Sequence, residues 1–385
     1  MASSASSPES SGTTGPAAVL VTGGGAAGSL FVSLDALLDR LRQPGTAPAP
    51  DRGTASPSSA DALAWAAAEA AWREADGPLL QAAGATVGVI VGSSRPVVET
   101  AATKGEARAV QDLVHTSPVA VAGQLARQLG CNGPCLTVSS ACASGGGAIA
   151  LAADLLAGGS CDAVLAGGVD LPTLPATAEL FARNGLWTPD RAAAASRPFD
   201  PVSPGIRIAD GAGFLLLERE GLRPPLPGAA VRLAGWAHRT DPRDRCGQNV
   251  AQTMLGACLS AALDRAGLDR GDLGFVYAHG NANPLSDSAE RAALKRFFAA
   301  TTGPVPVVAS KHLTGHCLGT SSAIEAAVTA RALKEGLALP ACLQLGTSDA
   351  SPPLPPKPPS HASVHALGLW GSCAALVFSR VSPAG

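Results

Sequence analysis

Two hydrophobic patterns alternate along this chain of 385 residues. Short runs of consecutive apolar residues predict buried strands, and longer segments with apolar residues three and four positions apart predict helices. The expected strands cover residues 17–22, 87–92, 136–140, 163–169, 214–218, 231–236, 275–278, 305–309 and 374–378. The expected helices cover residues 34–42, 60–75, 119–129, 148–156, 250–266, 289–300 and 322–335. Strands that alternate with helices in this way predict an α/β fold in layers.

Three stretches without a regular pattern divide the chain. Residues 1–15 are rich in Ser, Gly, Thr and Ala and lack a basic start or an apolar core, so we expect a flexible tail and not a signal peptide. The Pro-rich stretch 223–228 is the expected boundary between an N-terminal half, 16–222, and a C-terminal half, 229–385. A second Pro-rich stretch, 351–360, can be neither helix nor central strand, so we expect an exposed loop.

The composition is that of a compact globular protein, with 46% hydrophobic and 15% charged residues. Lys and Arg number 28 against 30 Asp and Glu, so no basic surface indicates nucleic acid as a partner. No apolar run approaches the ~20 residues that a membrane-spanning helix needs. We therefore expect no membrane association, and the cytoplasm is the expected compartment.

The nine cysteines are an odd number and never form Cys-x-x-Cys. This scatter argues against a disulfide framework and against a thiolate zinc site, so no metal is expected. The glycine-rich segment Gly23–Gly28 satisfies the G-x-G-x-x-G pattern after a predicted strand, which suggests a nicotinamide cofactor. Neither Asp39 nor Asp51 ends a second strand, however, and a tight first turn is the preferred interpretation.

Cys142 follows the predicted strand 136–140 and precedes a helix made almost wholly of small residues. A thiol at a helix N-terminus is expected to have a lowered pKa, which favours the reactive thiolate. The alternative is a buried structural cysteine. Gly145, Gly146 and Gly147 each weaken the helix by up to ~1 kcal/mol relative to Ala, which predicts close approach by another backbone segment. The Cys142 N–H would then share a pocket with its sulfur and could stabilise an oxyanion.

Three further polar residues far along the chain change the interpretation of this cysteine. His279 follows a predicted strand, and Lys311 and His316 precede the predicted helix 322–335. Glu325 in that helix is a possible salt partner for Lys311. Each residue alone would more often be structural, but a thiol, two histidines and a lysine together indicate acyl-transfer chemistry.

These residues stand in segments that resemble the β-ketoacyl synthases, the condensing enzymes of the thiolase superfamily. The resemblance covers nearly the whole chain after the tail. Its motifs are Gly133–Gly145 around the nucleophile, the Arg-Pro-Phe-Asp element Ser196–Asp200, the Gly-rich element Asp210–Gly213, the first histidine motif Ala278–Gly280, and the lysine and second histidine motif Ser310–Gly319.

The resemblance implies a five-layered αβαβα fold made of two similar βαβαβαββ halves, usually in a homodimer. Cys142 would take an acyl group from an acyl carrier protein. His279 and His316 would bind the carbonyl of a malonyl thioester during its decarboxylation, and Lys311, held by Glu325, would orient them. The activity implied is decarboxylative Claisen condensation, an acyltransferase reaction of fatty-acid or polyketide biosynthesis that uses no metal, nicotinamide or flavin.

The family's gating loop corresponds to Gly368–Gly371, where Leu369 would supply a second oxyanion N–H. Trp370 replaces a flexible glycine there, which should stiffen the gate. Asn281 and Asn283 replace two threonines that hydrogen-bond the phosphopantetheine arm in the family. Ser203 and Asp210 replace an arginine and a glutamate.

These departures leave alternatives open. One is acyl transfer or cyclisation without decarboxylation. The other is a non-catalytic subunit like the chain-length factors, which typically lack the nucleophilic cysteine. The retained catalytic residues favour condensation, and the Ala, Gly, Pro and Arg bias leans toward specialised metabolism. The expected partners are a carrier protein bearing acyl and malonyl groups, and a second copy or another ketosynthase-like subunit.

Overall fold

A computed structural model describes residues 18–43, 59–95, 114, 117–187, 196–224, 226, 230–247, 249–345 and 358–381. Within these residues the strands are β1 (Val19–Gly28), β2 (Val87–Gly92), β3 (Cys135–Val138), β4 (Ala163–Asp170), β5 (Gly211–Arg219), β6 (Ala230–Thr240), β7 (Phe275–Tyr277), β8 (Val305–Val308), β9 (Leu343–Leu345), β10 (His361–Gly368) and β11 (Ser372–Val381). The longer helices are α1 (Leu34–Leu41), α2 (Ala60–Glu74), α3 (Gly77–Ala82), α6 (Ala120–Leu129), α7 (Ser144–Ala157), α8 (Pro175–Arg183), α11 (Leu255–Ala266), α12 (Pro284–Phe297) and α14 (Ser321–Glu335).

The strand order repeats in the two halves of the chain. The order in the sheet is β3-β2-β4-β5-β1-β6-β11-β10-β7-β8-β9. Numbered within each half, the first five strands lie in the order 3-2-4-5-1, and β8-β7-β10-β11-β6 follow the same order if the edge strand β9, which pairs antiparallel with β8, is left out of the numbering. In both halves the last strand, β5 or β11, is antiparallel to its neighbours, and the other four numbered strands are parallel to one another. An antiparallel pairing between β1 and β6 joins the halves.

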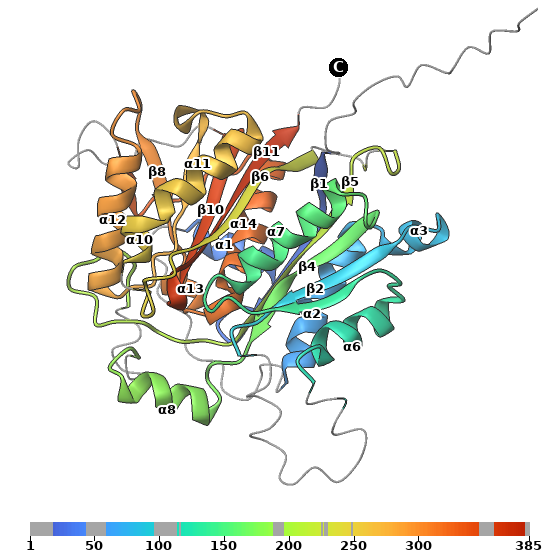
Figure 1. Ribbon diagram of the computed structural model, residues 1–385, viewed down its shortest axis with the longest axis horizontal. Coiled ribbons are helices and arrows are strands. Elements are labelled where there is room, and N and C mark those ends of the chain that lie inside the picture. The colour runs from blue at the N-terminus through green and yellow to red at the C-terminus, as the bar shows by residue number, and fades with distance from the viewer. Residues whose placement is uncertain are drawn as a thin grey trace, which may run out of the picture.

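Helices cover both outer faces and fill the centre, as Figure 1 shows. Helices α2 and α6 pack on the strands of the N-terminal half, and α11 packs on β6 and β11 of the C-terminal half, with α12 beside it. Between the halves lie α7 and α14, which contact each other and strands of both halves. The predicted five-layered α/β fold of two similar halves is confirmed. The boundaries at 15, 222 and 229 stay a prediction, because residues 1–17, 225 and 227–229 lie outside the described residues.

The glycine-rich segment Gly23–Gly28 lies inside strand β1, so the predicted tight turn is wrong. The glycines are required by close packing of α2 across this strand. A Cβ on Gly23 would lie 2.0 Å from the carbonyl oxygen of Ala71, and a Cβ on Gly25 would lie 2.1 Å from that of Ala67. The segment is a contact between helix and sheet, not a phosphate-binding loop.

The prediction of close backbone approach at the glycines of α7 is confirmed. A Cβ on Gly145 would lie 2.9 Å from the Cβ of Ala323 and 3.0 Å from the carbonyl oxygen of Gly319. The N–H of Gly146 donates a 2.9 Å hydrogen bond to Oγ of Ser322 in α14. Small residues therefore let the two central helices touch, which fixes the N-terminus of α7 beside the segment that carries His316.

Several predicted elements differ from the observed ones. Helix α12 begins five residues earlier than predicted, because Asn283 accepts hydrogen bonds from the N–H groups of Leu285 and Ser286 and so caps the helix. The predicted helix 250–266 breaks at Met254 into α10 (Val250–Thr253) and α11. Strands β9 and β10 and helices α3 and α8 are not among the predicted elements. Residues 351–357 of the second Pro-rich stretch lie outside the described residues. Across the described chain, no helix combines the length and apolarity needed to cross a bilayer.

Candidate active site

The polar residues of interest gather where parallel strands end. Strand β4 ends at Asp170, His279 follows β7 by two residues, and Lys311 follows β8 by three. Strands β7 and β8 are parallel neighbours, so their carboxyl ends meet at one edge of the sheet and bring His279 and Lys311 together. Asp170 comes from the other half and reaches this region by accepting the N–H of Gly319 at 2.7 Å. These side chains adjoin a cavity of about 420 Å³ lined by mostly apolar side chains. Of the predicted site residues, Cys142, Asn281, Asn283, Leu369, His279 and His316 line this cavity.

Cys142 sits on a tight turn just before α7. Ala141 has a φ of +52°, a left-handed conformation that costs energy for a residue with a Cβ. Ser144 braces this turn, since its hydroxyl accepts the N–H of Ser140 at 2.9 Å and lies 2.6 Å from the carbonyl oxygen of Ala141. The strained turn presents the thiol to the cavity at the N-terminal end of the buried helix.

The predicted lowering of the thiol pKa is wrong for this folded state. Burial raises the pKa of Cys142 to about 12, and the carboxylate of Asp170 acts in the same direction. Lys311 and Arg95 act against it but do not compensate. The partial charge of a helix N-terminus is worth about 1 kcal/mol, whereas removing a thiolate from water costs more than that. The resting site therefore holds a thiol.

His279 and His316 lie edge to face, with ring centroids 5.3 Å apart and an interplanar angle of 84°. Both are buried, at 4% and 2% exposure. Burial holds the pKa of each imidazole well below its usual value, and the charge of Lys311 lowers the pKa of both further. Two neutral imidazoles therefore share one cavity with a neutral thiol.

A hydroxyl fixes the orientation of His316. Oγ of Ser321 accepts the N–H of Cys317 at 3.0 Å and lies 3.1 Å from Nδ1 of His316. We assign the Ser321 proton to a hydrogen bond with Nδ1, which leaves Nε2 as the protonated ring nitrogen. A neutral imidazole held in this form can donate a hydrogen bond into the cavity.

Lys311 and Glu325 form an ion pair behind the histidines. Nζ of Lys311 lies 2.6 Å from Oε1 of Glu325, and both side chains are 2% exposed. The same ammonium donates to the carbonyl oxygen of His279. Burial raises the pKa of Glu325 to about 7, and the charge of Lys311 opposes this rise. The pair places a buried positive charge directly against the backbone of His279.

The loop predicted to act as a gate packs against Cys142. A Cβ on Gly368 would lie 3.1 Å from the backbone nitrogen of Cys142. Trp370 has a left-handed φ of +60° and is 63% exposed. Its N–H donates to the carbonyl oxygen of Arg245 at 3.1 Å, and the Arg245 guanidinium lies 5.4 Å from the centre of its ring. The loop that contains Trp370 is thus tied to the neighbouring loop that contains Arg245.

Both asparagines face the cavity, but their carbonyl oxygens are already engaged. Oδ1 of Asn281 accepts the N–H of Asn283 at 2.9 Å. Oδ1 of Asn283 accepts the N–H groups of Leu285 and Ser286 at the start of α12. Each side chain therefore offers its amide NH₂ as a donor to a ligand in the cavity.

Three buried carboxylates of the site were not among the predicted residues. Asp170 accepts hydrogen bonds from Ser93, Ser94 and Gly319, and burial raises its pKa to about 6. On α12, Glu290 accepts the backbone N–H groups of His279 and Gly280, and Asp287 accepts that of Asn281. One signal was available: a carboxylate directly after the buried run 163–169 marks a strand end at a site. The second signal was the three-residue spacing of Asp287 and Glu290, which places both on one face of a helix.

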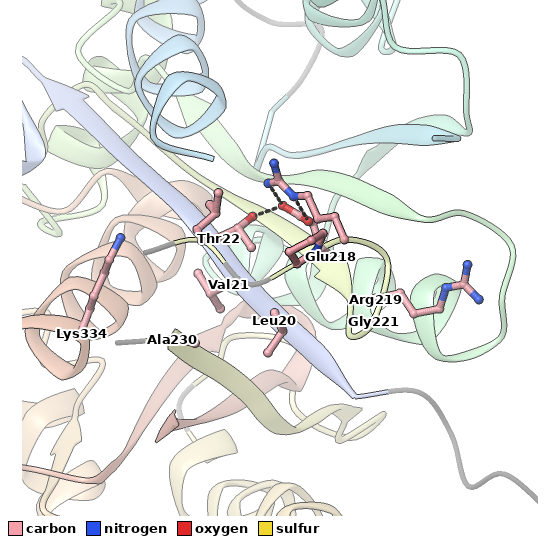
Figure 2. A pocket seen from close by; sticks show the side chains of 11 residues that line it. Leu20, Val21, Thr22, Glu218, Arg219, Gly221, Ala230 and Lys334 are labelled. Carbon is pink, nitrogen blue, oxygen red and sulfur yellow. Dashed lines mark hydrogen bonds and ion pairs between the residues drawn. The ribbon is translucent and has the colours of Figure 1, made fainter. Parts of the chain in front are cut away.

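A second, smaller cavity lies at the opposite end of the sheet. Figure 2 shows side chains from the start of β1 and the end of β5 around it. There the carboxylate of Glu218 accepts the hydroxyl of Thr22 at 2.5 Å and pairs with the guanidinium of Arg223 at 2.6 Å. None of the predicted site residues lines this cavity. In the described ranges, no group of His, Cys, Asp and Glu is arranged to hold a metal ion.

Comparison with known proteins identifies the family. Residues 44–221 match "Beta-ketoacyl synthase, N-terminal domain", and residues 230–345 match "Beta-ketoacyl synthase, C-terminal domain". Nodulation protein E of Rhizobium meliloti is 30% identical over 314 residues, which cover 77% of this chain and 75% of that protein. The tetracenomycin polyketide synthase ketoacyl synthase alpha subunit of Streptomyces glaucescens is 31% identical over 226 residues, 58% of this chain and 53% of that protein. The chain thus spans about half the length of several relatives it matches.

Solved structures agree with this fold. A type II PKS acyl-carrier protein in complex with its ketosynthase includes a chain that superposes with a TM-score of 0.77 at 21% identity, covering 95% of this chain and 100% of that one. The ishigamide ketosynthase/chain length factor gives a TM-score of 0.76 at 24% identity with the same coverage. Together with the matched domains and the relatives, the geometry of the site leads to one conclusion: this chain belongs to the β-ketoacyl synthase family.

Proposed function

We propose that this protein is an acyltransferase of the β-ketoacyl synthase type. It condenses an acyl group held on Cys142 with a malonyl group held on an acyl carrier protein, in polyketide or fatty-acid biosynthesis. The observation that supports this most strongly is one cavity that contains a thiol on a strained turn and two neutral imidazoles. A simple acyl carrier site would need the thiol alone, whereas the paired imidazole donors suit an enolate.

The first step is thioester exchange. The Cys142 sulfur attacks the carbonyl carbon of an acyl thioester, the thioester bond to the carrier breaks, and the carrier leaves as a free thiol. Because the resting thiol is protonated, its proton must leave during attack, and it passes to the departing sulfur of the carrier as the thioester bond breaks. The Cys142 N–H, at the start of α7, and the N–H of Leu369 stabilise the tetrahedral oxyanion.

The second step forms the carbon–carbon bond. The malonyl carboxylate leaves as carbon dioxide, and its electron pair forms an enolate whose oxygen accepts hydrogen bonds from His279 and His316. The enolate carbon attacks the acyl carbonyl, the bond to sulfur breaks, and Cys142 takes up one proton. Neutral imidazole donors held in place stabilise the enolate without prior reorganisation, which lowers the barrier to decarboxylation.

The substrate arm enters past Asn281 and Asn283, which replace the hydroxyls of the family pattern with amide donors. Both residues line the cavity, and their side-chain NH₂ groups would hydrogen-bond the amide carbonyls of a phosphopantetheine arm. The Leu369–Trp370 gate, tied to Arg245, moves less freely than a glycine loop would. These features alter the pose of the extender unit and leave the reaction class unchanged.

The partners we propose are a carrier protein and a second ketosynthase subunit. Among the described residues β3 is the last strand at its end of the sheet, and Leu136 on it is 40% exposed. Such an edge favours pairing with a second chain. We place the enzyme in the cytoplasm, where its nine free cysteines would stay reduced.

Intact-protein mass spectrometry tests the first step. After incubation with an acyl-pantetheine thioester, the wild type should gain one acyl mass, and Cys142→Ala should gain none. Native mass spectrometry of the same samples should show a dimer, and Leu136→Glu should weaken it. An acyl mass on the Cys142→Ala variant would contradict the assignment of the nucleophile. A stable monomer at micromolar concentration would contradict the assignment of the β3 edge.

A further inference from the structure

A buried histidine and glutamate lie directly behind His279. Nε2 of His365 is 2.6 Å from Oε1 of Glu290, and the side chains are 0% and 1% exposed. His365 stands on β10 and Glu290 on α12, two elements of the C-terminal half (Figure 1). Neither residue lines the active-site cavity, so neither contacts substrate. Their role must therefore be exerted through a neighbouring group.

That neighbouring group is the backbone of His279. Oε1 of Glu290 accepts the N–H of His279 at 2.8 Å, and Oε2 accepts the N–H of Gly280 at 2.9 Å. Strand β7 ends at Tyr277, so these amides have passed beyond the ladder that pairs β7 with β10. One turn earlier on α12, Asp287 accepts the N–H of Asn281 at 3.0 Å. Two carboxylates of one helix thus hold three consecutive amides.

The peptide group between His279 and Gly280 is held at both ends. Its N–H donates to Glu290, and its carbonyl oxygen accepts the ammonium of Lys311. The orientation of this peptide plane fixes ψ of His279 and so contributes to where the imidazole points. Any movement of the Glu290 carboxylate is passed to the histidine.

His365 is the group that fixes this carboxylate. The final torsion of a glutamate side chain is broad and has no strong preference of its own. Among the described residues, His365 supplies the side-chain hydrogen bond to Glu290, while the other donors to it are the two amides that it positions. His365 itself is held by the pairing of β10 with β7 and β11. The sheet thus holds the His365 imidazole, which holds the Glu290 carboxylate, and this carboxylate holds the backbone of His279.

We propose that His365 is a positioning residue for His279. Through Glu290 it sets the orientation of the His279 imidazole at the enolate oxygen. The inference rests on the proposed function, in which His279 serves decarboxylation and Cys142 serves acyl transfer. Loss of the His365 contact should therefore slow decarboxylation selectively and leave acylation of Cys142 intact.

Two variants that differ by one methylene group test the proposal. His365→Gln places an amide nitrogen near the position of Nε2 and retains the hydrogen bond to Glu290. His365→Asn has the same amide but is too short to reach it. Both are assayed for carbon dioxide release from malonyl-pantetheine and for acylation by hexanoyl-pantetheine, with circular dichroism and thermal melting as checks of folding.

Decarboxylation by His365→Asn should fall on the order of 100-fold, the effect of misplacing a catalytic group by about 1 Å, with KM little changed. His365→Gln should recover most of the rate, and acylation should stay within about twofold of wild type in both. Equal decarboxylation by the two variants, or a parallel fall in both half-reactions, would overturn the proposal.

NMR spectroscopy of backbone amide protons distinguishes failure of this inference from failure of the proposed function. In wild type and His365→Gln, the amide protons of His279 and Gly280 should resonate downfield, as carboxylate-bound amides do, and should move upfield in His365→Asn. If the wild type releases no carbon dioxide, condensation is refuted, but this shift still decides whether His365 positions the His279 backbone. Unchanged amide shifts in His365→Asn would refute the positioning role whatever the activity.

Discussion

The reactivity of Cys142 offers a sharp test, because two physical effects act on it in opposite directions. The helix N-terminus favours the thiolate, and burial favours the thiol. In the structure burial dominates and raises the pKa from 9.0 to about 12. Below pH 9 this change reduces the thiolate population about 1000-fold relative to an unperturbed thiol. The thiolate that does form is the stronger nucleophile, by a factor of about 16 to 30 for a Brønsted coefficient of 0.4 to 0.5.

The net expectation is alkylation of Cys142 about 30- to 60-fold slower than that of an unperturbed thiol, and slower still if the cavity limits access. The assay is carboxamidomethylation by iodoacetamide, followed by peptide mass spectrometry across a pH series. Cys246, which is exposed and lines the mouth of the same cavity, is the internal reference. The alkylation rate of Cys142 should still rise tenfold per pH unit at about pH 10, because this pH lies below the thiol pKa.

A Cys142 rate that reaches a plateau near pH 8, or that exceeds the Cys246 rate, would refute this reasoning. It would mean that the helix N-terminus and Lys311 outweigh burial. A variant sharpens the result: Asp170→Asn removes a carboxylate that raises the thiol pKa, so its alkylation should be faster than that of the wild type.

Three further predictions follow from packing, hydrogen bonding and charge. Gly25→Ala should lower the free energy of unfolding in urea by about 1–3 kcal/mol, because the new Cβ would collide with α2. Gly123→Ala in helix α6 should raise it by up to about 1 kcal/mol, because a Cβ there would meet nothing within 4 Å and Ala is the better helix former. Ser321→Ala should slow decarboxylation on the order of tenfold while sparing acylation of Cys142, since one hydrogen bond of about 1 kcal/mol sets the ring nitrogen that donates; equal slowing of both steps would argue against that role. The pKa of His316 is lower in the folded protein than the unfolded value of 6.5, so the stability that its neutral imidazole contributes is fully present above pH 6.5 and is lost as the pH falls below that value. Below pH 6.5 the free energy of unfolding of the wild type should therefore decline by up to about 1.4 kcal/mol per pH unit more than that of His316→Gln. Parallel pH curves for the two proteins would contradict the burial of a neutral imidazole.

The fold class and most elements could be predicted because periodicity is a local property. Strand β2 and helices α1, α2 and α14 lie within about a residue of their predicted bounds. The predicted strand ended at residue 22, because consecutive glycines are typical of a turn. Only the packing of α2 across β1 explains why these glycines stand within a strand. The start of α12 was missed although Asn283 and Pro284 form a recognisable N-terminal signal. Strand β10 carries two histidines and a serine, so its sequence did not indicate a strand, although every residue after His361 is buried.

The candidate site divides in the same way. The residues that carry chemistry stand in recognisable segments, and the structure brings Cys142, His279 and His316 to one cavity. The direction of the Cys142 pKa shift could not be predicted from the sequence. The helix N-terminus, which lowers the pKa, can be recognised in the local sequence, whereas desolvation, which raises it, depends on the whole fold. Glu290 and His365 were missed for a related reason: they are 75 positions apart, and only the sheet and α12 bring them within 2.6 Å.

The most direct test of the central claim is a single-turnover reaction of Cys142-acylated enzyme with malonyl-carrier protein. Carbon dioxide release and the mass of the product are followed together, with Cys142→Ala as control. The account predicts loss of the acyl adduct from Cys142, one carbon dioxide per turnover, and a carrier-bound product two carbons longer than the acyl group supplied. Loss of the adduct to another acceptor without carbon dioxide release would contradict condensation and would indicate acyl transfer or cyclisation instead.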